Sequence, residues 1–178
     1  MKTAKLLTIL LLGINFHAFS QTTQSTVVKV EGGLVEGNIE NGITIYRGIP
    51  FAAPPVGDLR WRPPQPVKIW EGILKAVTFA PACPQQVGVL TTGFAKYGFS
   101  EDCLYLNIWK PNVTSGKKLP VMVWIFGGGF TSGSASGDFT TGEKLAKKGV
   151  ILINISYRLG VLGFLAHPEL TSESENHA

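Results

Sequence analysis

The sequence predicts an α/β fold, on the evidence of two apolar strands and the helical segment between them. Residues 121–126 (VMVWIF) and 150–155 (VILINI) are runs of the kind found in strands covered on both faces, as in parallel sheets. Residues 142–149 (GEKLAKKG) predict a short helix closed by glycine. The segment between the strands is long enough for the crossover that a parallel pair requires, so we expect a right-handed β-α-β unit.

A small antiparallel sheet is expected to precede this unit and to lead into a central, mostly parallel sheet. Short apolar stretches at residues 27–30, 32–37 and 43–47 are separated by glycines, as in strands joined by tight turns. Residues 104–109 (LYLNIW) predict a further strand from their β-branched and aromatic content, and Pro111 ends it.

Residues 48–64 contain too many prolines for a helix or an interior strand. Phe51 and Trp61 lie within this segment, and large aromatic residues are usually buried. We therefore expect an ordered loop that wraps over the core. A proline-rich ligand for another domain is the alternative interpretation.

The first 20 residues predict a secretory signal peptide. Lys2 and Lys5 precede an apolar run at residues 6–14, and cleavage is expected after Ser20. The run is too short to span a bilayer, which disfavours the alternative of a transmembrane anchor. The protein is therefore expected to be secreted or periplasmic, without membrane contact after cleavage, and residues 21–178 are expected to belong to one domain.

The composition is that of a globular domain, with 44% hydrophobic and 16% charged residues. The formal net charge is +4, and it falls to +2 (4 − 2) when Lys2 and Lys5 leave with the signal peptide. No basic run is interleaved with aromatic residues, so a nucleic-acid partner is not expected.

Cys83 and Cys103 are the only cysteines. In an exported chain an even number of cysteines predicts a disulfide, and two free thiols are the alternative. The histidines, His17, His167 and His177, do not cluster with the cysteines in the sequence. We therefore expect no metal site.

Three consecutive glycines, Gly127, Gly128 and Gly129, follow the first apolar strand. Backbone N–H groups in such a turn can converge on a phosphate, or on the oxyanion that forms when an ester is attacked. A dinucleotide fingerprint would need a glycine at Ser132, and a P-loop would need a lysine at Ser134. Phosphate binding is therefore disfavoured, which leaves an oxyanion loop or a purely structural turn.

Five stretches of the chain, taken in order, resemble the type-B carboxylesterases, the family that includes cholinesterases and bile-salt-activated lipase. They are residues 46–66, 70–72, 100–111, 119–135 and 156–165. The resemblance implies an α/β-hydrolase fold, of which this chain would be the N-terminal part. The resemblance also implies that the enzyme uses no metal or organic cofactor.

The resemblance also assigns residues to roles. The family's oxyanion-hole glycines, the second and third of the triplet, fall on Gly128 and Gly129, and its cysteine pair falls on Cys83 and Cys103. Phe126 stands where many esterases with this kind of loop have histidine.

The catalytic triad is the main departure from the family pattern. The resemblance implies a serine in a G-x-S-x-G elbow, activated by a histidine that a carboxylate orients. No serine of this chain has glycine at both −2 and +2; Ser132 and Ser134 lack the elbow context, and His167 is expected on a surface loop. In the family the elbow follows the segment that begins at Ser156. We therefore expect the nucleophile, acid and histidine beyond Ala178, and the chain alone to be inactive.

The resemblance thus implies a carboxylic ester hydrolase that acts through an acyl-enzyme on a small-molecule ester. The alternatives are a non-catalytic, cholinesterase-like interaction protein and an inactive truncated remnant. Cholinesterases bind choline on a tryptophan between the paired cysteines, and residues 84–102 contain none, so choline esters are disfavoured. The two apolar strands would leave an open sheet edge, so residues 21–178 alone are expected to be poorly soluble.

Overall fold

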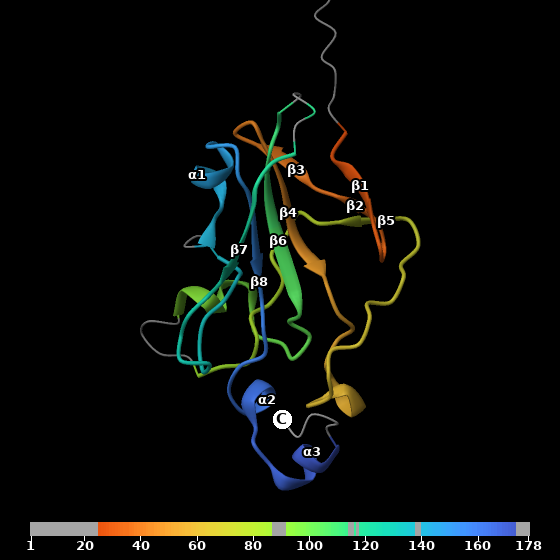
Figure 1. Ribbon diagram of the computed structural model, residues 1–178, viewed down its shortest axis with the longest axis vertical. Helices are drawn as coiled ribbons and strands as arrows, with labels where there is room; N and C mark the ends of the chain where they lie inside the picture. The colour runs from red at the N-terminus through yellow and green to blue at the C-terminus, as the bar shows by residue number, and fades with distance from the viewer. Residues whose placement is uncertain (1–24, 87–91, 114–115, 117, 138–139, 174–178) are drawn as a thin grey trace, which may run out of the picture.

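The computed structural model describes residues 25–86, 92–113, 116, 118–137 and 140–173 (Figure 1). The expected signal peptide, residues 1–20, lies outside the described residues. The described chain contains two sheets, a smaller one and a larger one, with short α-helices in the second half of the chain. The predicted α/β class is confirmed.

The smaller sheet has the strand order β1-β2-β5. β1 (Val27–Val30) pairs antiparallel with β2 (Gly33–Glu36), and β2 pairs parallel with β5 (Ile73–Lys75). Val35 of β2 is fully buried and packs in one cluster with Tyr46 and Ile49 of the larger sheet. This apolar cluster attaches the smaller sheet to the larger one.

The larger sheet has the order β3-β4-β6-β8-β7, with the strands at Asn38–Glu40, Ile43–Pro50, Tyr105–Pro111, Ile151–Ile155 and Val121–Ile125. β7 and β8 are parallel, as predicted, and the short helix α1 (Glu143–Ala146) lies between them in the chain. The other pairs are antiparallel, so over the described residues this sheet is mixed rather than mostly parallel.

The third predicted N-terminal strand belongs to the larger sheet, not to the small one. Residues 43–47 form the first part of β4, which continues to Pro50 in the proline-rich segment. The pairing of β4 with β6 is irregular between Tyr46 and Ile49, and Gly48 there has a φ of 74°. Its N–H donates to Oδ1 of Asn107 at 2.8 Å. This irregularity explains how β4 can continue into the proline-rich segment, where the prolines predicted no interior strand.

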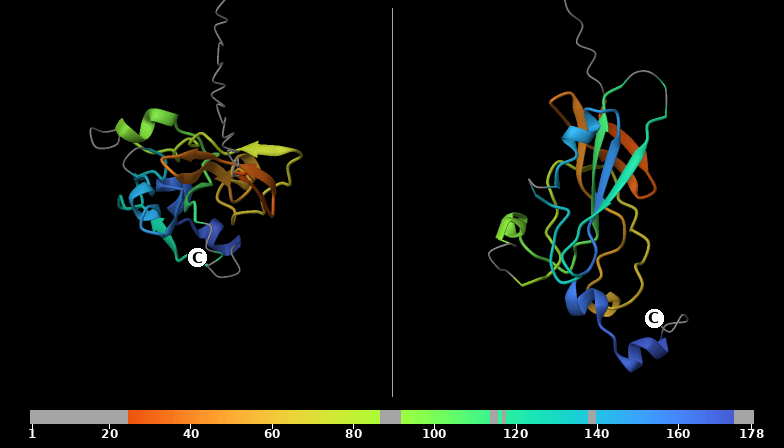
Figure 2. Two further views of the ribbon diagram at one scale, coloured as in Figure 1. Left: turned by 90° about the horizontal axis from the view of Figure 1, so that it is seen from above. Right: turned by 60° about the vertical axis from the view of Figure 1, so that its left-hand side comes forward.

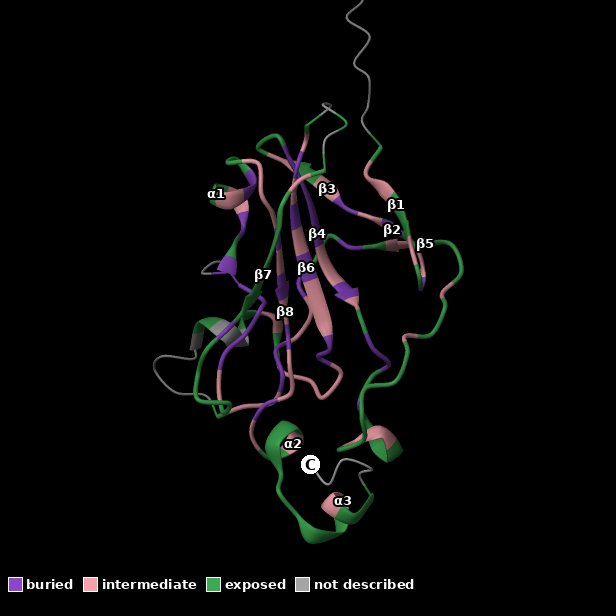
Figure 3. Cartoon of the chain, viewed as in Figure 1, coloured by how far each residue is buried: buried purple, intermediate pink, exposed green. Residues whose placement is uncertain are grey.

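β7 is exposed, contrary to the expectation of a strand covered on both faces. Its side chains range from 37% exposed at Trp124 to 63% at Ile125 (Figure 3). All five residues of β7 are exposed, so neither face of the strand is covered by the described residues. β7 is also an edge strand, paired only with β8 among the described residues. The open apolar edge expected from the sequence is therefore present.

The proline-rich segment is ordered, but its aromatic side chains are not buried. Phe51 is 39% exposed and Trp61 is 43% exposed. Polar contacts hold the segment instead: Nε1 of Trp61 donates to the Val161 carbonyl at 2.8 Å, and Arg60 forms two hydrogen bonds with Glu101, each of 2.6 Å. The short 3-10 helix η1 (Gly57–Leu59) lies in this loop.

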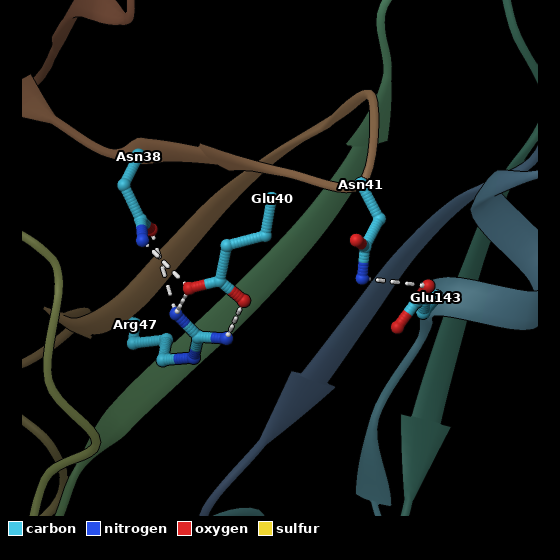
Figure 4. Close-up of polar contacts among 5 residues, drawn as sticks. All are labelled: Asn38, Glu40, Asn41, Arg47 and Glu143. Carbon is cyan, nitrogen blue, oxygen red and sulfur yellow. Dashed lines mark hydrogen bonds and ion pairs between the residues drawn. The ribbon is translucent and has the colours of Figure 1, made fainter.

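The β3–β4 hairpin is fixed by a polar cluster at the end of the sheet (Figure 4). The Arg47 guanidinium donates to both carboxylate oxygens of Glu40, at 2.8 and 2.7 Å, and this contact holds the pKa of Glu40 below its usual value. Asn41 in the turn donates to Glu143 at 3.2 Å, which connects the hairpin to α1. We assign this cluster a structural role.

Two short helices, α2 (Gly160–Phe164) and α3 (Pro168–Glu173), lie at the opposite end of the molecule from the β3–β4 turn (Figures 1 and 2). A further 3-10 helix, η2 (Thr92–Tyr97), follows the first cysteine. Over the described residues, no helix has the length and apolar character that a membrane crossing requires.

Candidate active site

The glycine triplet forms a sharp turn directly after β7. Phe126 is buried, whereas Gly127, Gly128 and Gly129 are exposed. Gly128 and Gly129 have φ values of 139° and 60°, a region that residues with a Cβ rarely adopt. Phe130 has a φ of 62° as well, although it is not glycine. The chain thus bends sharply here, and Gly128 and Gly129 adopt these positive φ values without the strain that a Cβ would add.

The turn is closed by the Gly128 carbonyl. This oxygen accepts hydrogen bonds from the N–H groups of Thr131 and Ser132, both at 3.2 Å. A Cβ on Gly128 would overlap the backbone carbonyl of Ser132, so no larger residue fits there without a backbone shift. At Gly127 and Gly129, in contrast, no atom of the described residues lies within 4 Å of where a Cβ would be.

The N–H groups of Gly128 and Gly129 have no acceptor among the described residues. Both glycines are exposed, so these donors are accessible. Two adjacent backbone N–H groups in a hydrogen-bonded turn form a site suited to a small anion or to an oxyanion that develops during a reaction.

Aromatic packing fixes the strand end from which the turn departs. The Phe126 ring stacks on Tyr157, with the ring centroids 4.3 Å apart, and the Tyr157 hydroxyl donates to the Phe126 carbonyl at 2.6 Å. Burial raises the pKa of Tyr157 above its ordinary value. On the other side of the triplet, the Phe130 carbonyl accepts the Gly160 N–H at 2.8 Å. The turn is therefore anchored to the segment around α2 at both ends.

Two buried asparagines support the chain that follows the turn. Asn107 donates to Oδ1 of Asn154 at 2.8 Å and to the Ala135 carbonyl at 3.0 Å, and Asn154 donates to the Thr140 carbonyl at 2.9 Å. Both side chains are at most 1% exposed. The sequence does not assign them a role, although Asn154 is the single polar residue of β8 and Asn107 has apolar neighbours on both sides in β6.

The structure contains the expected disulfide between Cys83 and Cys103. Both cysteines are buried and pack in one cluster with Phe126, Ala135 and Leu159. The disulfide therefore lies under the strand end that leads into the glycine turn. Beyond it, Gln85 contacts Gly133 at the far end of the turn, and no local sequence pattern predicts this contact.

The structure does not make Ser132, Ser134 or His167 part of a catalytic group. The Ser132 hydroxyl lies 3.3 Å from the Gly128 carbonyl, and the buried Ser134 hydroxyl bonds to the backbone of Ser136. His167 is exposed near α3, where its Nδ1 lies 3.4 Å from the Glu169 N–H. No serine and histidine side chains among the described residues are hydrogen-bonded to each other. Nor do these residues contain a group of histidine, cysteine and acidic side chains that could hold a metal ion.

Comparison with known proteins places this site in context. The model of the carboxylesterase family matches residues 24–176. Fumonisin B1 esterase of Sphingopyxis macrogoltabida is 49% identical over 158 residues, which cover 88% of this chain and 29% of that protein. Para-nitrobenzyl esterase of Bacillus subtilis is 44% identical over 141 residues, covering 78% of this chain and 29% of that protein.

Solved structures show the same relationship. A PNB esterase superimposes with a TM-score of 0.78 at 41% sequence identity, over 84% of this chain and 31% of the other. The neighbours are α/β-hydrolase esterases, so the two sheets described above correspond to the N-terminal part of that fold. The chain spans about three tenths of the length of the relatives it matches.

Proposed function

Because the chain belongs to the carboxylesterase family, we propose that it supplies the oxyanion-hole part of a serine hydrolase that cleaves small-molecule carboxylic esters. The observation that carries the proposal is the exposed turn in which the Gly128 and Gly129 N–H groups lack an acceptor among the described residues. The carbonyl oxygen of a bound ester would accept these two hydrogen bonds. They strengthen as the oxygen becomes negative, so they stabilise the transition state more than the substrate.

The reaction would follow the acyl-enzyme route. A serine hydroxyl attacks the ester carbonyl while a histidine takes its proton, and the alcohol then leaves with a proton from that histidine. Water cleaves the acyl-serine in a second attack of the same kind. Both tetrahedral intermediates place their oxyanion on Gly128 and Gly129. Removing a donor of this type typically lowers kcat about 10²- to 10³-fold.

The serine, acid and histidine would come from sequence other than these 178 residues. No serine of this chain has glycine at both −2 and +2, and the relatives are much longer than the matched segment. Two structural features favour further packing against this unit: the apolar edge strand β7 is exposed, and Nη1 of Arg158 is buried without a hydrogen-bond partner among the described residues. By itself, the chain would lack hydrolytic activity.

Export to the periplasm or the cell exterior is part of the proposal. Residues 1–20 have the pattern of a signal peptide, and the buried disulfide suits an oxidising compartment. A non-catalytic interaction protein is less favoured, because several of the matched relatives are named as esterases and a binding surface would not need an exposed oxyanion turn.

Labelling with a fluorophosphonate probe tests this function. Exported proteins of the producing cell are treated with the probe, and labelled bands are searched by mass spectrometry for peptides of this chain. We expect these peptides in a labelled protein much heavier than 19.2 kDa, the mass of this chain. Peptides found only in an unlabelled band near that mass would overturn the proposal in favour of an inactive remnant or a binding protein.

A further inference from the structure

We propose that Gln85 is a positioning residue of the oxyanion hole, whose side-chain amide holds Gly133 and thereby the turn that presents Gly128 and Gly129. This inference rests on the function proposed above. It adds to the site a component that belongs neither to the glycine triplet nor to a serine-histidine-acid triad.

The contact between Gln85 and Gly133 involves both ends of the amide. Nε2 of Gln85 donates to the Gly133 carbonyl at 2.7 Å, and the Gly133 N–H donates to Oε1 of Gln85 at 2.9 Å. A side chain that pairs with the N–H and the carbonyl of one residue fixes both its position and its orientation. Nε2 also donates to the Cys83 carbonyl at 3.1 Å, which restricts the rotation of the amide itself.

Gly133 is in turn packed against the start of the glycine turn. A Cβ at Gly133 would overlap the Phe126 ring and would approach the Gly127 carbonyl to 2.7 Å. Its φ of 127° also requires glycine. The two ends of the turn, Phe126 and Gly133, are thus in contact. Holding Gly133 in position therefore also fixes the two ends of the turn relative to each other.

Gln85 is well anchored for this role. It lies two residues after Cys83, which is joined to Cys103 just before β6. The Ala82 N–H donates to the Gly98 carbonyl and the Ser100 N–H donates to the Ala82 carbonyl, both at 3.0 Å. The amide therefore connects the glycine turn to a crosslinked segment rather than to a free loop.

Anchoring of the glycine turn should matter more for the rate of catalysis than for the stability of the fold. Oxyanion donors act only when they are held at hydrogen-bond distance from the developing charge, and a misplacement of about 1 Å can lower the rate about 10²-fold. Without the Gln85 contacts, the N–H groups of Gly128 and Gly129 would still be present, but they could reorient. The transition state would lose more than the bound substrate.

The test uses the protein at its natural length, with p-nitrophenyl acetate as substrate. Gln85→Glu keeps the acceptor for the Gly133 N–H but removes the donor, and Gln85→Met removes both while retaining the volume. Gln65→Glu is the matched control, because Gln65 is exposed and its side chain bonds only the neighbouring Pro63 carbonyl among the described residues. The kcat is expressed per active site titrated by a fluorophosphonate.

We expect kcat to fall about 10- to 100-fold in both Gln85 variants, with KM nearly unchanged and Gln65→Glu equal to the unsubstituted protein. The inhibition constant of a trifluoromethyl ketone, which forms a tetrahedral oxyanion adduct, should rise by the same factor as kcat/KM falls. A lower melting temperature with unchanged kcat and unchanged ketone affinity would overturn the inference, because Gln85 would then be merely structural. An unsubstituted protein that neither hydrolyses the ester nor reacts with the fluorophosphonate would instead refute the proposed function.

Discussion

Nδ2 of Asn107 in β6 donates a hydrogen bond to Oδ1 of Asn154 in the adjacent strand β8, at 2.8 Å and almost wholly out of contact with water. The pair lies between two parts of the chain: Asn107 accepts the Gly48 N–H from β4, and Asn154 donates to the Thr140 carbonyl beyond the glycine turn. It therefore connects the bulged strand of the larger sheet to the segment that carries the candidate site.

The two asparagines should be energetically coupled. Asn107→Ala and Asn154→Ala each leave buried polar groups without a partner, so each should lower the free energy of unfolding by about 1–3 kcal/mol. The double variant should be less destabilised than the sum of the two, by about 1 kcal/mol. Urea unfolding of the natural-length protein measures this cycle, and strictly additive losses would show that the observed hydrogen bond contributes nothing.

The disulfide should stabilise the native protein and resist reduction. Replacing Cys83 and Cys103 together by serine removes a crosslink over a sequence separation of 20, which is worth roughly 3 kcal/mol in a chain-entropy model. Because both cysteines are buried, dithiothreitol should reduce the bond slowly until urea opens the fold. Thiol titration along a urea series measures this. Rapid reduction in the absence of urea would contradict the buried placement.

Tyr105 should titrate unusually late. Burial, followed by its hydrogen bond to Asp102, raises its pKa from 10.0 to about 12. Since the folded state then holds the phenol proton more tightly than the unfolded state, this contribution to stability is present below pH 10 and is lost as the pH rises towards 12. The pH titration of phenolate absorbance should be compared between the unsubstituted protein and Tyr105→Phe. The difference between the two curves should be one tyrosine that titrates near pH 12. A difference that titrates near 10 would contradict the assignment.

The open edge of β7 should limit the solubility of residues 21–178 expressed alone. Val123, at 53% exposed, is the middle residue of this edge strand, and Val123→Lys should raise the soluble fraction. Ile69→Lys is the control, since Ile69 is 83% exposed but lies in no strand. Sedimentation of cell lysates measures both variants. Equal gains would mean that exposed apolar area in general, rather than the strand edge, limits solubility.

The features that the sequence predicted best are those set by neighbouring residues. The apolar run of β7, the helical segment before β8 and the glycine triplet are each read from a few consecutive positions, and the structure contains a parallel pair, a short helix and a sharp turn there. The roles of Gly128 and Gly129 as oxyanion donors stay a prediction.

The features that were missed depend on partners far apart in the chain. Gln85 and Gly133 are separated by 48 residues, and Asn107 and Asn154 by 47. The local sequence does not distinguish a glutamine on the surface from one whose side-chain amide hydrogen-bonds to a distant part of the backbone. The exposure of β7 was misjudged for a related reason, since an apolar run predicts that a strand can be covered but not which residues cover it.

The role of the glycine turn is tested most directly by comparing Gly128→Ala with Gly127→Ala in the natural-length protein. A Cβ on Gly128 collides with the backbone of Ser132, whereas a Cβ on Gly127 has no atom of the described residues within 4 Å. We predict that Gly128→Ala lowers kcat for ester hydrolysis about 10²- to 10³-fold and that Gly127→Ala stays close to the unsubstituted enzyme. Equal activity of the two variants would contradict the assignment of this turn as the oxyanion hole.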